Sequence, residues 1–337
     1  MRYLFQLLPH ANLHYRACQT LLGSAELGSM LQAMEIQGEV EACNLGGAAF
    51  LSVDTEKISP NQLNVLSRHS ALLMMCTQEG ELLRPLAFDT ADYLPRDLAE
   101  VLKYKGKTSA AFTRMMINMA CAAAGKLESE TPITVLDPMC GRGTTLYCAL
   151  EMGMNGIGVE VDRKDLQEAA NYLERYCALH KLKHNLKQGS ETCGKTAVPW
   201  AAYTLADTKE HYAAGDTRQL KICQGDTALA PDLVKKHRAD ILVADLPYGI
   251  QHAPQDGRKP ESFIGLMKHA LPAWHKALKT DGAMALSFNT LTLKREKLLE
   301  LVTEAGFIPI EEKPYGAMPH FVEQAVTRDV LIAKVSK

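Results

Sequence analysis

The chain lacks any strong excess of charge, since 37 basic residues against 39 acidic ones give a formal net charge of −2 over 337 residues. This excludes binding of nucleic acid through an overall positive field, although a local basic surface on a nearly neutral protein is sufficient. An uninterrupted apolar run of the length that a membrane-spanning helix requires is also absent. The composition is therefore that of a globular protein outside a membrane.

Cysteine pairs at the C-x-x-C spacing are also missing, although the chain contains nine cysteines. Two histidine pairs have helical spacing, His10 with His14 and His180 with His184, but neither has a carboxylate or cysteine at ligand spacing beside it. These patterns predict no disulfide framework and no metal site. The short apolar run at the start does not resemble a secretory signal, so we expect a cytoplasmic location.

The character of the chain changes near residue 97. Residues 1–97 mix short apolar strands with helices, which predicts a small α+β domain with a role in substrate recognition. Residues 98–337 alternate helices with strands of continuous apolar character, which is typical of a mostly parallel sheet covered on both faces. A polar stretch at about residues 181–218 is expected to be an irregular insertion. The predicted fold class is α/β, with a Rossmann-like domain of mostly parallel sheet after the small domain.

The run V-L-D-P-M-C-G-R-G-T-T, residues 135–145, joins a predicted strand to a predicted helix. Glycine permits the tight turn, and a helix N-terminus binds carboxylates and phosphates. Dinucleotide-binding loops share these features, but here Leu146 replaces their third glycine. The pattern favours S-adenosylmethionine (SAM), because the aspartate can bind its ammonium group, and Thr144 and Thr145 can cap the helix and meet its carboxylate. The expected cofactor-binding residues of this loop are Asp137, Met139, Gly141, Gly143 and Thr144.

Two further carboxylates follow predicted strands and complete the expected SAM site. Glu160 ends the strand G-I-G-V-E and is expected to accept both ribose hydroxyls, whereas Asp162 is expected to cap the next helix. Asp226 directly follows the strand 220–223 and is expected to accept the adenine amine. Asp216 is the competing residue for that contact, and the alternative for Asp226 is a turn that satisfies its own backbone.

The run V-A-D-L-P-Y-G forms a second loop after a predicted strand. An amine on an aromatic ring is a weak nucleophile, so acceptors that hold its two N–H groups are needed to aim its lone pair. Asp245 and the Leu246 carbonyl are the expected acceptors, and Pro247 fixes the loop. Tyr248 is expected to stack on a base, and Gly249 lets the backbone pass close to it. The expected catalytic residues are Asp245, Pro247 and Tyr248, with Leu246 and Gly249 binding the substrate.

These motifs resemble the catalytic domain of the Rossmann-fold SAM-dependent RNA guanosine-N2 methyltransferases, the family that includes the THUMP-associated tRNA enzymes. The helix 112–120 and the loops 137–145 and 245–249 carry the resemblance, which covers roughly residues 104–335. It implies methylation of an exocyclic amine of a nucleobase, guanosine N2 of an RNA, with tRNA favoured. Leu246 departs from the proline of many amino-methyltransferases, and the N-terminal region does not read as a THUMP domain. The resemblance therefore does not identify the RNA.

The expected RNA-binding residues are lysines at the start of the polar stretch, namely Lys181, Lys183 and Lys187. In the run 318–329 near the end of the chain, His320 and Arg328 are candidates to face the substrate, but a structural ion pair between Glu323 and Arg328 is favoured. A DNA adenine or cytosine amino-methyltransferase, which uses a similar loop on a flipped base, is the enzymatic alternative. A protein or small-molecule methyltransferase and a non-catalytic binding module are the others. The sequence does not indicate the oligomeric state.

Overall fold

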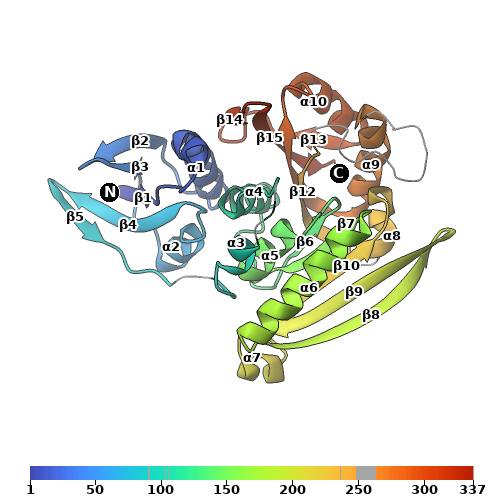
Figure 1. Cartoon of the computed structure of the whole chain (residues 1–337). Helices are drawn as coiled ribbons and strands as arrows, with labels where there is room; N and C mark the ends of the chain where they lie inside the picture. The colour runs from blue at the N-terminus through green and yellow to red at the C-terminus, as the bar shows by residue number, and fades with distance from the viewer. Residues whose placement is uncertain (90–91, 103, 105, 236, 248–262, 337) are drawn as a thin grey trace.

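The computed structural model describes residues 1–89, 92–102, 104, 106–235, 237–247 and 263–336, which form two sheets and the helices around them (Figure 1). The N-terminal sheet is antiparallel, with the strand order β2-β3-β1-β4-β5. Its elements in chain order are β1 (Arg2–Leu7), α1 (Leu13–Ala33), β2 (Val40–Leu45), β3 (Ala48–Asp54), α2 (Pro60–Leu66), β4 (Leu72–Glu79) and β5 (Leu82–Pro85).

The first six of these elements form a split βαβ arrangement in which α1 and α2 cover one face of the sheet. Phe5, Leu51 and Met75 on that face are buried against the helices. The sequence did not predict β2 and β5, because most of their residues are exposed and show no apolar alternation. Pairing with a neighbouring strand, rather than burial, defines these two edges.

The second sheet has the order β13-β15-β12-β11-β6-β7-β10-β9-β8, with β14 paired to β15. Five central strands are parallel: β6 (Thr134–Asp137), β7 (Asn155–Glu160), β10 (Arg218–Gln224), β11 (Ala239–Asp245) and β12 (Leu278–Asn289). The antiparallel strands are β8 (Lys183–Cys193), β9 (Thr196–Ala206), β13 (Phe307–Pro309), β14 (His320–Glu323) and β15 (Val326–Val335).

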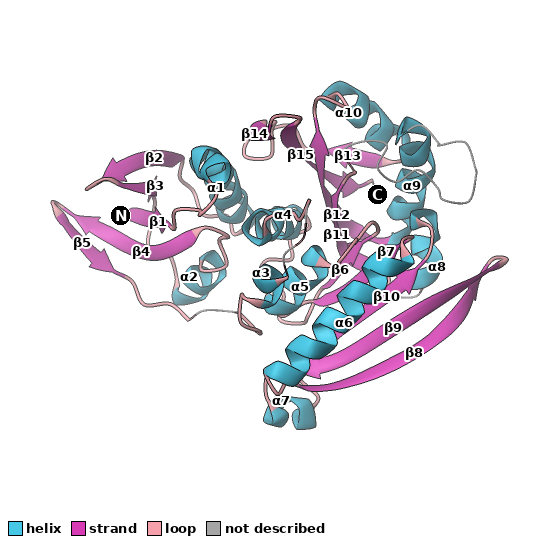
Figure 2. Ribbon diagram, viewed as in Figure 1, coloured by secondary structure: helices cyan, strands magenta, loops and turns pink. Residues whose placement is uncertain are grey.

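Numbered along the chain, the parallel strands run in the spatial order 3-2-1-4-5, which is the doubly wound order with a switch point between β6 and β11. Helices cover both faces (Figure 2). One face packs on α4 (Ala110–Ala123), α5 (Thr144–Glu151) and α6 (Arg163–Leu179), and the other on α8 (Ala230–Val234), α9 (Phe263–Ala277) and α10 (Arg295–Glu304). The remaining short helices are α3 (Leu98–Val101), α7 (Lys209–Ala214) and the 3-10 helix η1 (Thr227–Leu229). The predicted α/β fold class is confirmed.

The polar stretch at 181–218 is not irregular, which corrects the expectation from sequence. Residues 183–193 and 196–206 form the hairpin β8–β9, which extends the large sheet beyond β10. An antiparallel edge can keep polar side chains in water while its backbone groups pair. The exposed, mixed pattern of β8 therefore reflects its outermost place in the sheet.

One hydrophobic core runs from the N-terminal sheet into the large sheet, and α4 lies at its centre. Thirteen of the fourteen residues of α4 are buried, as expected for a helix enclosed on all sides. It packs against α1 on one side and the strands β11, β12 and β15 on the other. Because the core crosses residue 97, the division into two domains at that residue stays a prediction. No helix in the described part of the chain is long and apolar enough to cross a membrane.

A buried polar cluster joins α1 to α4 within this core. Glu26 of α1, which is fully buried, accepts from the Ser70 amide (2.8 Å) and from Asn118 Nδ2 of α4 (2.7 Å) through Oε1. Its Oε2 accepts from the Ser70 hydroxyl (2.5 Å) and lies 3.5 Å from His69 Nε2. Since a buried carboxylate is tolerated only with such partners, the cluster fixes how α1 seats on α4.

Glu26→Ala is expected to lower the free energy of unfolding by about 3 kcal/mol, because the donors around it lose their acceptor inside the core. Urea denaturation followed by circular dichroism measures the change. Glu304→Ala, at an exposed helical glutamate, is the matched control and should change the free energy by less than about 0.5 kcal/mol. Equal effects of the two substitutions would contradict the structural role of Glu26.

Candidate active site

The loop between β6 and α5 turns through two glycines in the left-handed region, Gly141 with φ 51° and Gly143 with φ 87°. A side chain at either position would be strained, which explains why the sequence has glycine there. The expected capping role of Thr144 and Thr145 is wrong: Gly143 is the N-cap of α5 and no side chain caps it. The hydroxyls turn elsewhere, since Thr144 Oγ1 lies 3.1 Å from Tyr104 Oη and the Thr145 side chain bonds to Asp137.

Asp137 ends β6 and is buried, with 3% of its surface exposed. Its Oδ1 accepts from the Met139 amide at 3.1 Å, which holds the side chain against the turn of the loop. The pKa of the carboxyl group is raised from 3.8 to about 7. Burial is the main cause and the charges of Glu160 and Asp245 act in the same direction, whereas the hydrogen bonds from Thr145 and Met139 oppose the rise. The three carboxylates therefore interact electrostatically.

Glu160 ends β7 beside this loop. Its Oε2 accepts from the Gly141 amide and its Oε1 from the Asp162 amide, both at 2.8 Å. As expected, Asp162 caps α6, because its side chain accepts from the amides of the first helical turn. Glu160 thus braces the glycine loop and lies at the carboxyl edge of the sheet, whereas the Asp162 side chain is committed to the helix.

Asp226 follows β10, and the adjacent Gly225 amide donates to the Glu160 carbonyl at 2.9 Å, which ties this turn to the end of β7. The Asp226 side chain accepts from the Ala228 amide at 2.8 Å and caps η1. Asp216 lies before β10 begins, at the opposite end of the strand, where it pairs with Arg218. Of the two candidates, Asp226 is the one at the carboxyl edge, and its bond to the Ala228 amide is the local backbone contact that the alternative interpretation predicted.

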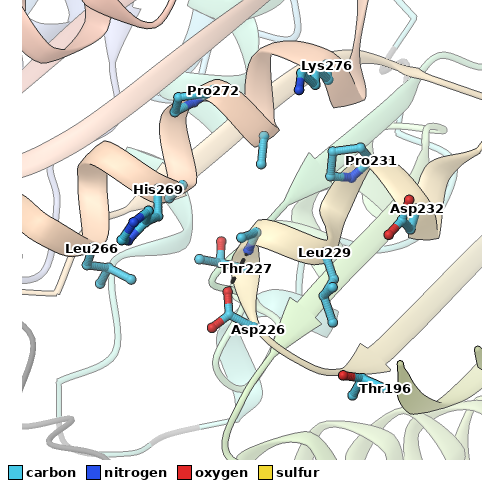
Figure 3. A pocket seen from close by; sticks show the side chains of 13 residues that line it. Thr196, Asp226, Thr227, Leu229, Pro231, Asp232, Leu266, His269, Pro272 and Lys276 are labelled. Carbon is cyan, nitrogen blue, oxygen red and sulfur yellow. Dashed lines mark hydrogen bonds between the residues drawn. The ribbon is translucent and has the colours of Figure 1, made fainter. Parts of the chain in front are cut away.

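A hollow of about 690 Å³ opens beside Asp226 between η1, α8 and α9 (Figure 3). Its walls include Leu229, Leu266 and Ala270, with His269 at the rim of α9. The lining is mixed, because the charged side chains of Asp226, Asp232 and Lys276 lie among these apolar ones. Asp137 and Asp245 do not line this hollow, which lies to one side of them along the sheet edge.

Asp245 ends β11, next to β6 at the switch point. Its Oδ1 accepts from Ser287 Oγ of β12 at 2.7 Å. Its Oδ2 accepts a short hydrogen bond from the Thr108 hydroxyl and lies 3.4 Å from Arg328 Nη2 of β15. Donors from three different segments thus orient one carboxylate.

The rest of the second loop is described only as far as Pro247. Leu246 is 1% exposed, and its amide donates to the Ser287 carbonyl at 2.8 Å, so the loop leaves β11 along a fixed path. Tyr248 and Gly249 lie outside the described residues. Their expected roles stay predictions.

The favoured ion pair between Glu323 and Arg328 is wrong. Among the described residues, Arg328 instead pairs with Asp245 and donates to Tyr15 Oη, while Glu323 is exposed. The cause is the register of the strands, in which Arg328 lies opposite Asn289 of β12 and is buried. The buried guanidinium therefore faces the carboxyl edge of the sheet, at Asp245.

Several other residues at this edge were missed by sequence reasoning. Ser287 lies opposite Asp245 in the register of β11 and β12, so a known strand pairing was the signal required. Thr108 precedes α4 and has no sequence signal, since its role depends on the packing of α4 against the sheet. The N-cap of α4 is the next residue, Ser109, whose side chain makes no capping bond.

The expected RNA-binding lysines lie away from the carboxylates. Lys181, Lys183 and Lys187 are exposed at the start of β8, the outermost strand of the large sheet. His184 and Arg218 both pair with Leu205, so the start of β8 lies level with the start of β10, at the end of the sheet opposite the carboxylates. Five strand spacings also separate β8 from β11, or about 24 Å at 4.8 Å each. Contact with both places requires a substrate of macromolecular size. Among the described residues, no group of three or more histidines, cysteines or acidic residues has a geometry suited to a metal ion.

Comparison with known proteins finds no matching family model and no matching curated sequence. Solved structures with some similarity include TrmN from Thermus thermophilus, 17% identical with a TM-score of 0.40 over 88% of this chain. The chain spans 60% of the length of TrmN. A TehB-like SAM-dependent methyltransferase from Corynebacterium glutamicum is 14% identical (TM-score 0.34; 64% of this chain and 87% of that one). An rRNA methylase from Streptococcus thermophilus is 10% identical (TM-score 0.35; 61% and 88%). The fold assignment rests on the strand order of the chain itself.

Asp137→Asn is expected to change how stability depends on pH. The folded pKa of about 7 exceeds the unfolded value of 3.8, so the folded protein holds a proton that the unfolded chain loses between these values. The wild type therefore loses stability as pH rises from about 4 to about 7, and the neutral asparagine does not. The free energy of unfolding of the variant, relative to that of the wild type, should rise by on the order of 2 kcal/mol or more between pH 4 and pH 8.

Urea denaturation of both proteins at several pH values measures this difference. Asp54→Asn, at an aspartate whose side chain is 69% exposed, is the control and should give a difference that stays flat with pH. A flat difference for Asp137→Asn as well would contradict the raised pKa.

Proposed function

We propose that this protein is a SAM-dependent methyltransferase that acts on an exocyclic amine of a nucleobase, guanosine N2 of an RNA, with tRNA the favoured substrate. The observation that carries the proposal is the meeting of Asp137, Glu160 and Asp245 at the carboxyl ends of three adjacent strands. Ligands of doubly wound sheets bind at this edge, beside the switch point.

The residues present fit SAM in the chemistry of their groups. Asp137 is a buried acceptor for the ammonium, the N-terminus of α5 suits the carboxylate, and Glu160 and Asp226 suit the ribose and the adenine amine. At Gly141 no heavy atom lies within 4 Å of the place where a Cβ would stand, so the loop leaves open space for a ligand. Met139 and Gly143 belong to the same loop. When bound, SAM supplies a methyl group on a positively charged sulfur.

Asp245 is the proposed acceptor for one N–H of the target amine, and the Leu246 carbonyl is the proposed second acceptor. Together they orient the nitrogen lone pair, and the carboxylate stabilises positive charge that develops on the nitrogen. Pro247 restricts the loop and offers no competing N–H. The proposed role of Tyr248 is to stack on the base, with Gly249 making room for it.

RNA is favoured over the other acceptors because the exposed lysines of β8 suit a long phosphate backbone that also reaches the sheet edge. A DNA amino-methyltransferase is the second candidate, since the same loop geometry serves a flipped base in either nucleic acid. A non-catalytic binding module is disfavoured by the donors that orient Asp245, which a site without chemistry does not need.

Methyl transfer from labelled SAM to small RNA, ribosomal RNA and DNA, prepared from cells that lack this protein, tests the proposal directly. Asp245→Asn should lower turnover by at least about 100-fold while SAM still binds, because it removes the charge and one acceptor at the nitrogen. Asp281→Asn, in the salt bridge with Lys126 at the other end of β12, is the matched control and should stay active.

Label recovered as N2-methylguanosine in one RNA pool supports the proposal and identifies that pool. Label in DNA alone would replace it with the DNA enzyme. Binding of SAM without transfer to any pool would point to other acceptors or to the binding module.

A triple variant with reversed charge at the proposed RNA-binding residues should bind RNA at least tenfold more weakly at low salt. It combines Lys181→Glu, Lys183→Glu and Lys187→Glu. The slope of log affinity against log salt should become shallower by about 2 to 3, since three phosphate contacts are lost. Fluorescence anisotropy with labelled RNA measures both effects. Lys294→Glu, Lys297→Glu and Lys334→Glu carry the same charge change on other elements and should leave the slope close to that of wild type. An equal loss in both triple variants would rule out a specific role for β8.

A further inference from the structure

The buried guanidinium of Arg328 connects the N-terminal helix α1 to Asp245. Its Nη1 donates to Tyr15 Oη at 2.6 Å, and its Nη2 lies 3.4 Å from Asp245 Oδ2. Its central carbon lies 4.8 Å from the centroid of the Phe112 ring, on α4. Three segments that are far apart in the sequence therefore fix one cation.

The position of Tyr15 is itself well defined. It lies in the first turn of α1, where the side chain of the N-cap Asn12 accepts from the amides of His14 and Tyr15. The Tyr15 ring also packs 6.2 Å from the Phe112 ring, centroid to centroid. The hydroxyl is thus a fixed acceptor for Arg328 rather than a group on a free side chain.

A charged side chain in the core is expensive unless each of its donors has a partner, and the planar fork of arginine allows few orientations once two partners are fixed. Only 4% of the Arg328 side chain is exposed. His320 lies across the strand pair from Arg328, with its ring 5.3 Å from Phe112. Burial lowers the pKa of His320, with the charge of Arg328 acting in the same direction, so the imidazole is neutral at pH 7. Of the two basic side chains beside Phe112, Arg328 therefore carries the positive charge and His320 does not.

We propose that Arg328 is a positioning residue for Asp245, and that Tyr15 of the N-terminal region holds Arg328 in place. The inference rests on the proposed function, because it assigns Arg328 to the carboxylate that orients the target amine. Thr108 and Ser287 hold the same carboxylate from two other sides. Loss of the third support lets the carboxylate turn away from the amine, which lowers the rate of the chemical step more than it lowers the binding of either substrate.

Tyr15→Phe removes one hydroxyl and keeps the ring, so the protein should fold. We expect kcat for methyl transfer to fall about tenfold, with the dissociation constant of SAM and the KM for RNA changing less than twofold. The matched control is Tyr93→Phe. Tyr93 is likewise a tyrosine beside an arginine, since the Arg218 guanidinium stacks 3.9 Å over its ring and its hydroxyl donates to the Asp216 carbonyl. It lies near the start of β10, away from Asp245. Removal of the Tyr93 hydroxyl should leave kcat unchanged.

Substitution of Arg328 itself gives a graded test. Arg328→Lys keeps the charge but not the fork and should retain part of the activity, whereas Arg328→Met should lose more than Tyr15→Phe does. Arg218→Met, at the arginine that pairs with Asp216, is the control and should keep wild-type kcat. Equal activity of the Lys and Met variants would overturn the proposed role of the charge.

Crystal structures of wild type and Tyr15→Phe separate this inference from the proposed function. If the wild type methylates RNA and Tyr15→Phe has the kcat of Tyr93→Phe, the positioning role is overturned while the function stands. If the wild type methylates no nucleic acid, the function fails, and the structures decide the inference alone. A rotated Asp245 carboxylate in Tyr15→Phe supports it, and unchanged Arg328 and Asp245 side chains overturn it.

Discussion

The parallel pairing of β6 with β11 is the constraint on which the candidate site depends. In this pairing Ile241 lies opposite Val135 and Leu242 opposite Leu136, so the two strands end side by side. Beyond β6 the sheet continues with β7 and β10, and beyond β11 it continues with β12, so the following chain segments diverge. The space between diverging loops at a switch point is where such sheets bind ligands. Asp137 and Asp245 stand on its two sides.

This geometry concentrates negative charge, and the surroundings show how the fold tolerates it. Asp137 has a pKa near 7, mainly because of burial, with Glu160 and Asp245 contributing. Glu160 is stabilised by two backbone amides, and Asp245 by two hydroxyls and the Arg328 guanidinium. Each pKa unit corresponds to about 1.4 kcal/mol of preference for the neutral form. A ligand with a positive charge beside Asp137 would offset that preference and favour the ionised carboxylate.

The sequence predicted the parts of the fold that burial patterns encode. Helix α5 follows the glycine loop as expected, and the carboxylates lie at strand ends, because continuous apolar runs that end in glycine turns leave a clear signal. The hairpin β8–β9 and the strands β2 and β5 were missed, since edge strands are polar and are held by pairing partners that no local pattern reveals. Arg328 was assigned to the wrong partner for the same reason. Its contact with Asp245 follows from the register of three strands, which is a property of the whole sheet.

The N-terminal region and the large sheet share α4, so their packing is coupled. The apolar side chains of α4 face both α1 and the sheet, and a helix buried on all sides cannot lose one cover without exposing that surface to water. Glu26 fixes one end of the contact between α1 and α4, and Tyr15 lies near the other, beside Phe112. The position of α1 on α4 therefore determines where Arg328 can lie, and Arg328 in turn orients Asp245. A shift of α1 would therefore reach the Asp245 carboxylate through Tyr15 and Arg328.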